Sequence, residues 1–295
     1  MKVLSPAKIN LFLEITGRRP DGYHEIATLF AKVGLYDELE FHVAQGSQVR
    51  LKIKNMTTDS LLPDSHNLVL RAAEAFREAF GIRQGLAIGL IKRIPLGAGL
   101  GGGSSNAGIT LRCLSRLFKL PLNSKTHQKM KILATKLGAD VPLFLKENSF
   151  YTGRGVGDLL EPFRVKKMPY WALLVFPGFP SATAEAYRRL KIPPRQVVLT
   201  SLSNLHKLKR NLLLGSSILY WGNLLFNRLE EVVFSAHPVV HQIKDALLSC
   251  GAPGALMSGS GSSVFGLVRS REEGEKILHF ISTHDLRAFL VPILT

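Results

Sequence analysis

Eleven consecutive residues decide the fold of this chain: Pro95-Leu96-Gly97-Ala98-Gly99-Leu100-Gly101-Gly102-Gly103-Ser104-Ser105. Five of the seven positions from 97 to 103 are glycine. The stretch before them, residues 86–94, is strand-like and leads into the glycines. Behind Ser104 and Ser105, which are good N-cap residues, apolar residues recur at helical spacing: Ala107, Leu111, Leu114 and Phe118. We therefore expect the glycines to join a strand to the N-terminus of a helix.

The chemistry expected of such a glycine-rich connection is phosphate binding. Without Cβ atoms, backbone N–H groups can wrap a polyphosphate, and the helix N-terminus adds about half a positive charge. A flexible surface connection is the alternative, but it does not require the backbone entropy that five glycines cost. The dinucleotide-binding pattern also matches at 97, 99 and 102, yet the acid expected after the next strand is missing. A P-loop lysine and the protein-kinase triplets H-R-D and D-F-G are missing as well.

Length and composition predict a globular protein of two domains. The chain has 295 residues, of which 46% are hydrophobic and 20% charged, as in proteins that bury a sizeable core. Cys113 and Cys250 stand too far apart for a disulfide framework or a paired zinc motif, which favours a reducing, cytoplasmic setting. The N-terminus reaches Pro6 and Lys8 before any long apolar run, so a signal peptide is not expected. Asn, Ser and Gly interrupt the longest uncharged stretch, 211–227, so a membrane-spanning helix is not expected either.

Strand and helix patterns are mixed along the chain. Residues 8–15 alternate between two faces, and Pro20-Asp21-Gly22 predicts a turn that leads to a second extended run at 26–33. A composition shift at 147–157 marks a domain boundary. Helices are expected over 126–137 and 182–190 and along the stripe Ile218, Trp221, Leu225, Leu229 and Val232, and strands over 171–176 and 264–268. Because strands and helices do not alternate strictly, the pattern favours the α+β class.

Four further motifs make the sequence recognisable: Pro6-Ala7-Lys8-Ile9-Asn10-Leu11, Asp21-Gly22-Tyr23-His24, Gly138-Ala139-Asp140-Val141-Pro142 and Met257-Ser258-Gly259-Ser260-Gly261. With the glycine stretch, their order and spacing resemble the GHMP kinase superfamily, named after galactokinase and the homoserine, mevalonate and phosphomevalonate kinases. The resemblance implies a two-domain α+β fold with the active site in the interdomain cleft. A nucleotide-binding N-terminal domain would cover residues 1–150 and a C-terminal domain residues 151–295. Gly259-Ser260-Gly261, in the last of these segments, resembles the family's third motif and is called the third motif below. It would pack beneath the phosphate loop.

The resemblance is strongest to members that phosphorylate the 2-hydroxyl of a methylerythritol linked to cytidine diphosphate, in the non-mevalonate route to isoprenoid precursors. It implies ATP as cofactor, with Mg²⁺ because phosphoryl transfer from ATP generally needs the ion. The implied partner is a small molecule with a cytidine diphosphate moiety, and neither nucleic acid nor a membrane is expected. Two alternatives stay open: another kinase of the superfamily acting on mevalonate, homoserine or a sugar, and a basic nucleic-acid-binding protein without catalysis.

The resemblance also assigns catalytic and nucleotide-binding residues. Asp140 resembles the base that takes the proton of the attacking hydroxyl, and Lys8 its partner, whose charge stabilises negative charge on that oxygen. Residues 95–105 would hold the phosphates, and Asn67 matches a position that lines the adenine pocket. Each has a plainer interpretation: Asp140 and Asn67 as helix N-caps, and Lys8 as a solvent-facing strand lysine that discourages edge pairing.

Five residues resemble the substrate-binding set. Tyr23 and His24 match the pair that stacks on and hydrogen-bonds to cytosine. Asn10 projects from the same strand face as the lysine two residues before it and can reach the same substrate oxygens. Tyr187 stands where a second aromatic covers the other face of the base, and Thr183 is near the substrate diphosphate. The plainer interpretations are a turn-capping amide at Asn10 and core or rim aromatic residues.

The chain is strongly basic. Lys and Arg total 38 against 22 acids, a net charge of +16, which favours phosphate-rich ligands, nucleic acid or an anionic membrane surface. Residues 186–229 contain no acid but eight basic residues: 188, 189, 191, 195, 207, 209, 210 and 228. A basic helical face there could flank an anionic substrate, bind nucleic acid or be solvated. A solvated face is preferred, because the spacing matches no known nucleic-acid module.

Overall fold

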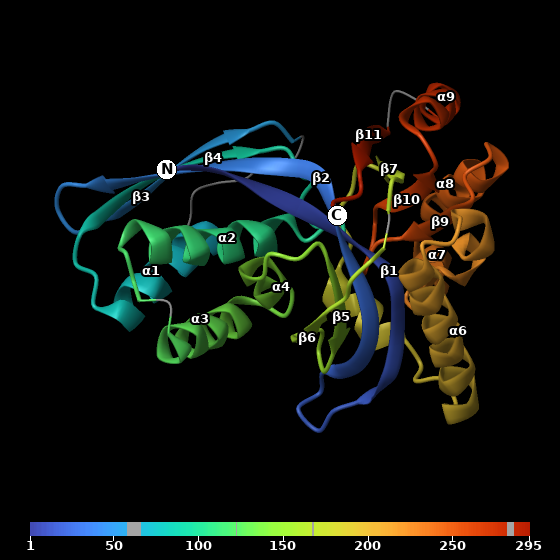
Figure 1. Ribbon diagram of the computed structural model, residues 1–295, viewed down its shortest axis with the longest axis horizontal. Coiled ribbons are helices and arrows are strands. Elements are labelled where there is room, and N and C mark those ends of the chain that lie inside the picture. The colour runs from blue at the N-terminus through green and yellow to red at the C-terminus, as the bar shows by residue number, and fades with distance from the viewer. Residues whose placement is uncertain (58–65, 122, 167, 282–285) are drawn as a thin grey trace. The chain divides into compact units, whose positions relative to one another are not determined.

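The computed structural model describes residues 1–57, 66–121, 123–166, 168–281 and 286–295. These residues form two compact units (Figure 1). The first comprises Met1–Ala7, Leu35–Leu96 and Gly101–Glu147, and the second Lys8–Gly34, Gly97–Leu100 and Asn148–Thr295. The predicted domains 1–150 and 151–295 stay a prediction. The boundary between the compact units falls between Glu147 and Asn148, but the second unit also includes two earlier segments, Lys8–Gly34 and Gly97–Leu100.

Two long strands, β1 (Lys2–Arg18) and β2 (His24–Ala44), contribute residues to both units. The predicted turn between them is present: Gly22 has φ +88° and its N–H donates to the carbonyl of Arg19 at 3.0 Å. Residues 8–15 of β1 are buried on both faces of the strand. The polar residues among them must therefore find partners inside the protein.

In the first unit, a sheet packs against helices. β2 pairs antiparallel with β4 (Gly85–Lys92), and β4 pairs parallel with β3 (Val49–Asn55). Alternate residues of β4, Leu86, Ile88 and Leu90, share one apolar core with α1 (Leu68–Phe80) and α2 (Gly102–Leu117). Figure 1 shows these helices together with α3 (Ser124–Leu137) and α4 (Val141–Leu145).

The second unit contains a four-stranded antiparallel sheet in the order β11-β7-β10-β9. Its strands are β7 (Trp171–Phe176), β9 (Gly254–Met257), β10 (Val264–Val268) and β11 (Arg287–Pro292). The helices that share a core with this sheet include α7 (Glu230–Ala236), α8 (Pro238–Ser249) and α9 (Arg271–Ile281). Strands 171–176 and 264–268 begin and end where the sequence predicts.

The remaining elements of the second unit connect this sheet to β1 and β2. β5 (Phe150–Arg154) pairs with β2 and with β6 (Leu159–Pro162), and β8 (Phe226–Asn227) pairs parallel with β1. Two helices follow β7: α5 (Thr183–Arg189) and α6 (Arg195–Leu214). The mixed content confirms the α+β class. Within the described residues, none of the helices combines the length and the apolar character needed to cross a membrane.

The predicted helical stripe from Ile218 to Val232 is wrong. The segment forms two short 3₁₀ turns, η1 (Ile218–Tyr220) and η2 (Gly222–Leu224), then β8, and becomes α-helical at Glu230. Gly222 lets the segment approach Pro253 closely, since a Cβ at position 222 would lie 2.2 Å from the carbonyl oxygen of Pro253. The apolar spacing that predicted a helix reflects the burial of Ile218 and Trp221 in these turns.

Candidate active site

The glycine-rich loop has an alternating backbone. Gly97, Gly99 and Gly101 have φ of +59°, +75° and +67°, while Ala98 and Leu100 between them do not adopt positive φ. Only glycine takes the left-handed conformation at low cost, which explains a glycine at every second position. Such alternation turns successive N–H groups to one side and forms a concavity that suits an anion.

The helix after the loop begins earlier than the sequence predicts. α2 starts at Gly102 with Gly101 at its N-cap, and no side chain accepts a hydrogen bond there, so the predicted capping by Ser104 and Ser105 is wrong. Glycine at 102 lets the start of α2 lie close to Lys92, since a Cβ there would lie 2.8 Å from Nζ of Lys92. With no capping side chain, the first N–H groups of α2 are left for a ligand, as in phosphate sites at helix N-termini.

The first half of the loop, Gly97–Leu100, is fixed within the second unit. Each of its four carbonyl groups accepts a hydrogen bond, from the N–H of Ser181 at 2.8 Å, the N–H of Ser263 at 3.2 Å, Oγ of Ser258 at 3.0 Å and the N–H of Lys8 at 3.0 Å, in chain order. The loop is therefore tied to β1, to the segment before α5 and to the third motif. This packing agrees with what the resemblance implies for 258–261.

Two glycines permit the closest approaches at this point. A Cβ at Gly99 would lie 2.0 Å from the carbonyl oxygen of Ser258, and a Cβ at Gly259 would lie 3.1 Å from Nζ of Lys8 and 3.4 Å from Oδ1 of Asn10. The third motif thus lies between the loop and the polar residues of β1.

Lys8 begins a buried polar chain in the second unit. Its Nζ donates to Oδ1 of Asn10 at 2.8 Å, and Nδ2 of Asn10 donates to Oγ1 of Thr28 at 2.9 Å. Thr28 donates in turn to the carbonyl of Phe12 at 2.7 Å. Lys8 is only 3% exposed, so the interpretation as a solvent-facing strand lysine is wrong. A buried ammonium is retained at such a position only with polar or anionic partners.

The two predicted substrate residues on α5, Tyr187 and Thr183, contact the start of β2 and the third motif. The rings of Tyr187 and His24 have centroids 5.3 Å apart at an interplanar angle of 41°, and Oγ1 of Thr183 lies 2.7 Å from Oγ of Ser260. Burial, with a smaller contribution from the charge of Arg18, lowers the pKa of His24, which favours its neutral ring. α5 therefore connects the third motif to the start of β2.

Tyr23 lies beside this ring pair in the sequence but is 65% exposed. Its N–H donates to Oδ1 of Asp21 at 3.1 Å within the turn. The side chain of Tyr23 is thus presented to solvent at the start of β2. Its stacking on a base stays a prediction.

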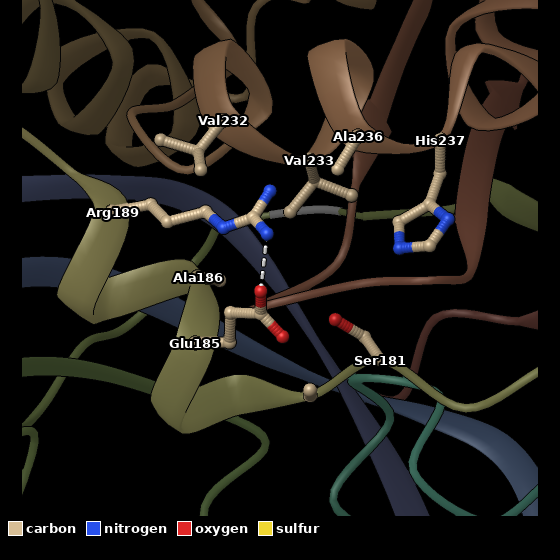
Figure 2. Close-up of a pocket in the computed structure, with 9 residues that line it drawn as sticks. Ser181, Glu185, Ala186, Arg189, Val232, Val233, Ala236 and His237 are labelled. Atoms are coloured by element: carbon tan, nitrogen blue, oxygen red, sulfur yellow. Dashed lines mark ion pairs between the residues drawn. The ribbon is translucent and has the colours of Figure 1, made fainter.

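Glu185, Ala186 and Arg189 of α5 line a cavity of about 250 Å³. Figure 2 shows the side chains around it. Glu185 and Arg189 form an ion pair at 2.5 Å along α5, and Val232 and His237 lie across the cavity on and after α7. Ser181 also lines it, and its hydroxyl donates to the carbonyl of Ser260 at 2.6 Å. The cavity therefore lies behind the helix that carries Thr183 and Tyr187.

Asp140 belongs to the first unit and stands at the N-cap position of α4. Its side chain makes no capping hydrogen bond, so the interpretation as an ordinary N-cap residue does not account for the carboxylate. α4 packs tightly on α2, because a Cβ at Gly108 would lie 2.7 Å from Cβ of Phe144. The phosphate helix and the start of α4 are thereby fixed to one another. The approach of Asp140 to Lys8 stays a prediction.

Sequence reasoning missed a buried network beneath the first turn of α2. Nζ of Lys92 contacts Oδ2 of Asp37 at 2.5 Å and the carbonyl of Ile94 at 2.8 Å. Nδ2 of Asn106 donates to Oδ2 of Asp37 and to Oγ of Ser5, both at 3.0 Å, and Ser5 lies 2.7 Å from Oγ of Ser105. Burial lowers the pKa of Lys92, and Asp37 opposes this shift. The signal in the sequence was a lysine, Lys92, directly after the apolar stretch 85–91.

Asn67 is the N-cap of α1, since its Oδ1 accepts a hydrogen bond from the N–H of Val69 at 2.9 Å. This role satisfies the plainer interpretation, and the adenine contact stays a prediction. Among the residues that the structure describes, no group of three or more His, Cys, Asp or Glu side chains is arranged to hold a metal ion.

Comparison with known proteins places the chain in a family. Residues 67–148 match the N-terminal domain of GHMP kinases and residues 203–285 their C-terminal domain. The chain belongs to the GHMP kinase family, whose members are ATP-dependent kinases.

Within the family, the similarity to one enzyme is high. The chain is 41% identical over 289 residues to the 4-diphosphocytidyl-2-C-methyl-D-erythritol kinase of Chlorobium phaeobacteroides, covering 98% of this chain and 96% of that one. It is also 41% identical to the kinase of the same name from Syntrophus aciditrophicus, covering 94% and 92% of the two chains. A crystal structure of 4-(cytidine 5'-diphospho)-2C-methyl-D-erythritol kinase aligns with TM-score 0.77 and 32% identity over 99% of both chains. A homoserine kinase from Cytophaga hutchinsonii aligns with TM-score 0.78 at 22% identity over 100% of this chain and 94% of that one, which shows the shared fold alone.

Proposed function

We propose that the protein transfers the γ-phosphoryl group of ATP to the 2-hydroxyl of 4-diphosphocytidyl-2-C-methyl-D-erythritol. The observation that carries the proposal is a continuous set of contacts in the second unit. Gly259 approaches the ammonium of Lys8, its neighbour Ser260 contacts Thr183, and one turn further along α5 Tyr187 meets His24. This set joins a platform for a flat base to a buried cation beside the phosphate loop. The names of the similar kinases support the same substrate.

The ring pair would hold the cytosine. A neutral His24 offers one donor and one acceptor to the polar edge of a base, and the ring of Tyr187 offers an aromatic face. The lowered pKa of His24 favours this neutral form. Thr183, one turn before Tyr187 on α5, would then face the diphosphate that follows the nucleoside. Tyr23, exposed at the end of the same turn, is free to fold over the base when the substrate binds.

The loop and the N-terminus of α2 would hold the triphosphate of ATP. The left-handed glycines direct N–H groups to one side, and the uncapped first turn of α2 adds its positive end. Mg²⁺ would come with the nucleotide and would supply positive charge to the phosphates that the loop and the start of α2 hold. Asn67 would line the adenine pocket from its position at the start of α1.

Asp140 and Lys8 would carry the transfer itself. Asp140 accepts the proton of the 2-hydroxyl while the hydroxyl oxygen forms a bond to the γ-phosphorus. The bond between the γ-phosphorus and the bridging oxygen breaks, and ADP leaves. Lys8 stabilises the negative charge on the attacking oxygen, and Asn10, which accepts a hydrogen bond from Lys8, orients the ammonium. This reaction requires neither nucleic acid nor a membrane, and its expected setting is the cytoplasm.

The test is ADP release on addition of the cytidine-linked methylerythritol, with mevalonate, homoserine and galactose as competing substrates. The expected result is turnover with the cytidine-linked substrate alone. Asp140→Asn should lower kcat by about 10²- to 10⁴-fold, the usual contribution of a general base. Asp245→Asn, an exposed acid on α8, is the matched control and should leave kcat unchanged. Preferred turnover of another substrate would refute the proposal, and full activity of Asp140→Asn would refute the assigned base.

A further inference from the structure

In the second unit, exposed apolar and basic side chains follow one another closely along the chain at the end of α6. The apolar residues lie at the end of α6 and in the turn after it, and four of them are between 51% and 74% exposed. Two exposed basic residues precede them on α6. We call this set the α6 surface: Lys207, Arg210, Leu213, Leu214, Leu219 and Tyr220. Because residues three and four apart on a helix are neighbours, Arg210 lies beside both Leu213 and Leu214.

The fold holds this turn in place, so its exposure does not come from loose packing. Leu219 and Tyr220 stand between Ile218 and Trp221, which are both fully buried. The N–H of Ile218 donates to the hydroxyl of Tyr170 at 3.0 Å, and Nε1 of Trp221 donates to the carbonyl of Ser216 at 3.2 Å. With its two flanking residues anchored, the turn keeps the two apolar side chains directed toward solvent.

The segment that carries the α6 surface has charge of one sign. The sequence has no acid from 186 to 229, and among the described residues neither Lys207 nor Arg210 has an ion-pair partner. A further exposed lysine comes from outside this segment, since the N–H of Lys166 donates to the carbonyl of Leu212 at 3.4 Å. Arg269 and Arg271 of the same unit differ, because each pairs with a glutamate four residues on. The α6 surface is therefore left cationic.

The exposed apolar and basic side chains together indicate which kind of partner the α6 surface binds. A solvated face accounts for the basic residues but not for the four exposed apolar residues that follow them within ten positions of the chain. A second copy of the chain would bring two acid-free basic faces together, which like-charge repulsion opposes. Nucleic acid would use the cations, but leucines contribute little to it, and Tyr220 is the single aromatic of the set.

We propose that the α6 surface binds the surface of a bilayer that contains anionic phospholipids. Lys207 and Arg210 would meet the phosphate groups, and Leu213, Leu214 and the residues of the turn would enter the boundary between headgroups and acyl chains. Binding of this kind needs no membrane-spanning helix. It would add a membrane partner, contrary to the expectation drawn from the sequence, and the vesicle experiment decides between the two.

The experiment measures cosedimentation of the full chain with vesicles. Phosphatidylcholine vesicles containing phosphatidylglycerol are compared with vesicles of phosphatidylcholine alone, at low and at high salt. The double variant Lys207→Gln, Arg210→Gln should bind the anionic vesicles about 30-fold more weakly, since each cation near such a surface contributes roughly five-fold. The matched control, Arg269→Gln with Arg271→Gln, removes the same net charge from paired arginines and should bind like the unaltered protein.

The apolar contribution is tested separately with Leu213→Ser, Leu214→Ser, which should weaken binding by about ten-fold or more. Its control is Phe280→Ser, which alters a side chain that is 76% exposed on α9. Retained kinase turnover shows that each variant is folded. Equal sedimentation with both vesicle types, or none with either, overturns the proposal. So does loss of self-association or of RNA binding in these variants without any vesicle binding, which would assign the surface to a second copy or to nucleic acid.

Discussion

Replacing Gly99 by alanine tests whether the phosphate loop is positioned by its contact with the third motif. At Gly99 φ is +75°, and the added Cβ would lie 2.0 Å from the carbonyl oxygen of Ser258 and 2.9 Å from that of Gly261. Both contacts are with backbone atoms, so a side-chain rotation cannot relieve them. Gly46→Ala is the matched control, because φ there is +79° and a Cβ would meet nothing within 4 Å.

The two substitutions separate backbone strain from displacement of the loop. The left-handed conformation costs about 1–2 kcal/mol for alanine at either position. At Gly99 the Cβ must also move about 1 Å away from Ser258, which adds roughly 1–3 kcal/mol of overpacking. The hydrogen bond from Ser258 to the carbonyl of Gly99 is disturbed as well, at a cost of about 1 kcal/mol. The expected losses of unfolding free energy are about 3–6 kcal/mol for Gly99→Ala and about 1–2 kcal/mol for Gly46→Ala.

The decisive assay is nucleotide binding rather than stability. A loop displaced by about 1 Å should weaken productive ATP binding by about 10²-fold, measured as kcat/KM for ATP and as affinity by calorimetry. The control should bind ATP like the unaltered protein, even though it is also less stable to denaturant. Equal ATP affinities for Gly99→Ala and Gly46→Ala would refute the reasoning that contact with Ser258 positions the loop.

Three further predictions concern the buried residues Asp37 and Cys113 and the half-buried His24. Asp37→Asn leaves the ammonium of Lys92 without its carboxylate, so urea unfolding should show a loss of about 3–5 kcal/mol, and an unchanged midpoint would contradict the role of the pair. Because burial lowers the pKa of His24, its ring stays neutral as the pH falls through the ordinary histidine range. The KM for the cytidine substrate should therefore be flat there and rise only at lower pH, whereas a rise at the ordinary histidine pKa would contradict this environment. Burial raises the pKa of the Cys113 thiol to about 11, so alkylation of the native protein followed by mass spectrometry should label half-buried Cys250 first, and preferential labelling of Cys113 would contradict its burial.

Local patterns predicted the elements whose identity depends on near neighbours. The strands at 171–176 and 264–268 are continuous apolar runs, and the structure has them at the same residues. The stripe from 218 to 232 failed for the same reason, because apolar residues three and four apart also fit successive 3₁₀ turns. The close approach of Gly222 to the carbonyl of Pro253 joins residues far apart in the sequence, and no local pattern contains it.

Some features of the candidate site could be predicted from the sequence, and others became visible only in the fold. The motifs located the glycine loop, Lys8, His24 and Asp140, because the resemblance is carried by contiguous residues. They could not show that Lys8 is buried, since its partners depend on how β1 and β2 pack. The network of Ser5, Asp37, Lys92 and Asn106 escaped prediction because its members come from four separate segments and meet only in the folded unit.

The most direct test of the proposed reaction is the position of the new phosphate ester. The product formed from ATP and the cytidine-linked methylerythritol is isolated, and its phosphorus and carbon couplings are measured by NMR. The expected spectrum shows one new monophosphate ester on the 2-oxygen beside an intact diphosphate, with one ADP formed per ester. A phosphate on another oxygen, or ADP formed without any ester, would contradict transfer to the 2-hydroxyl.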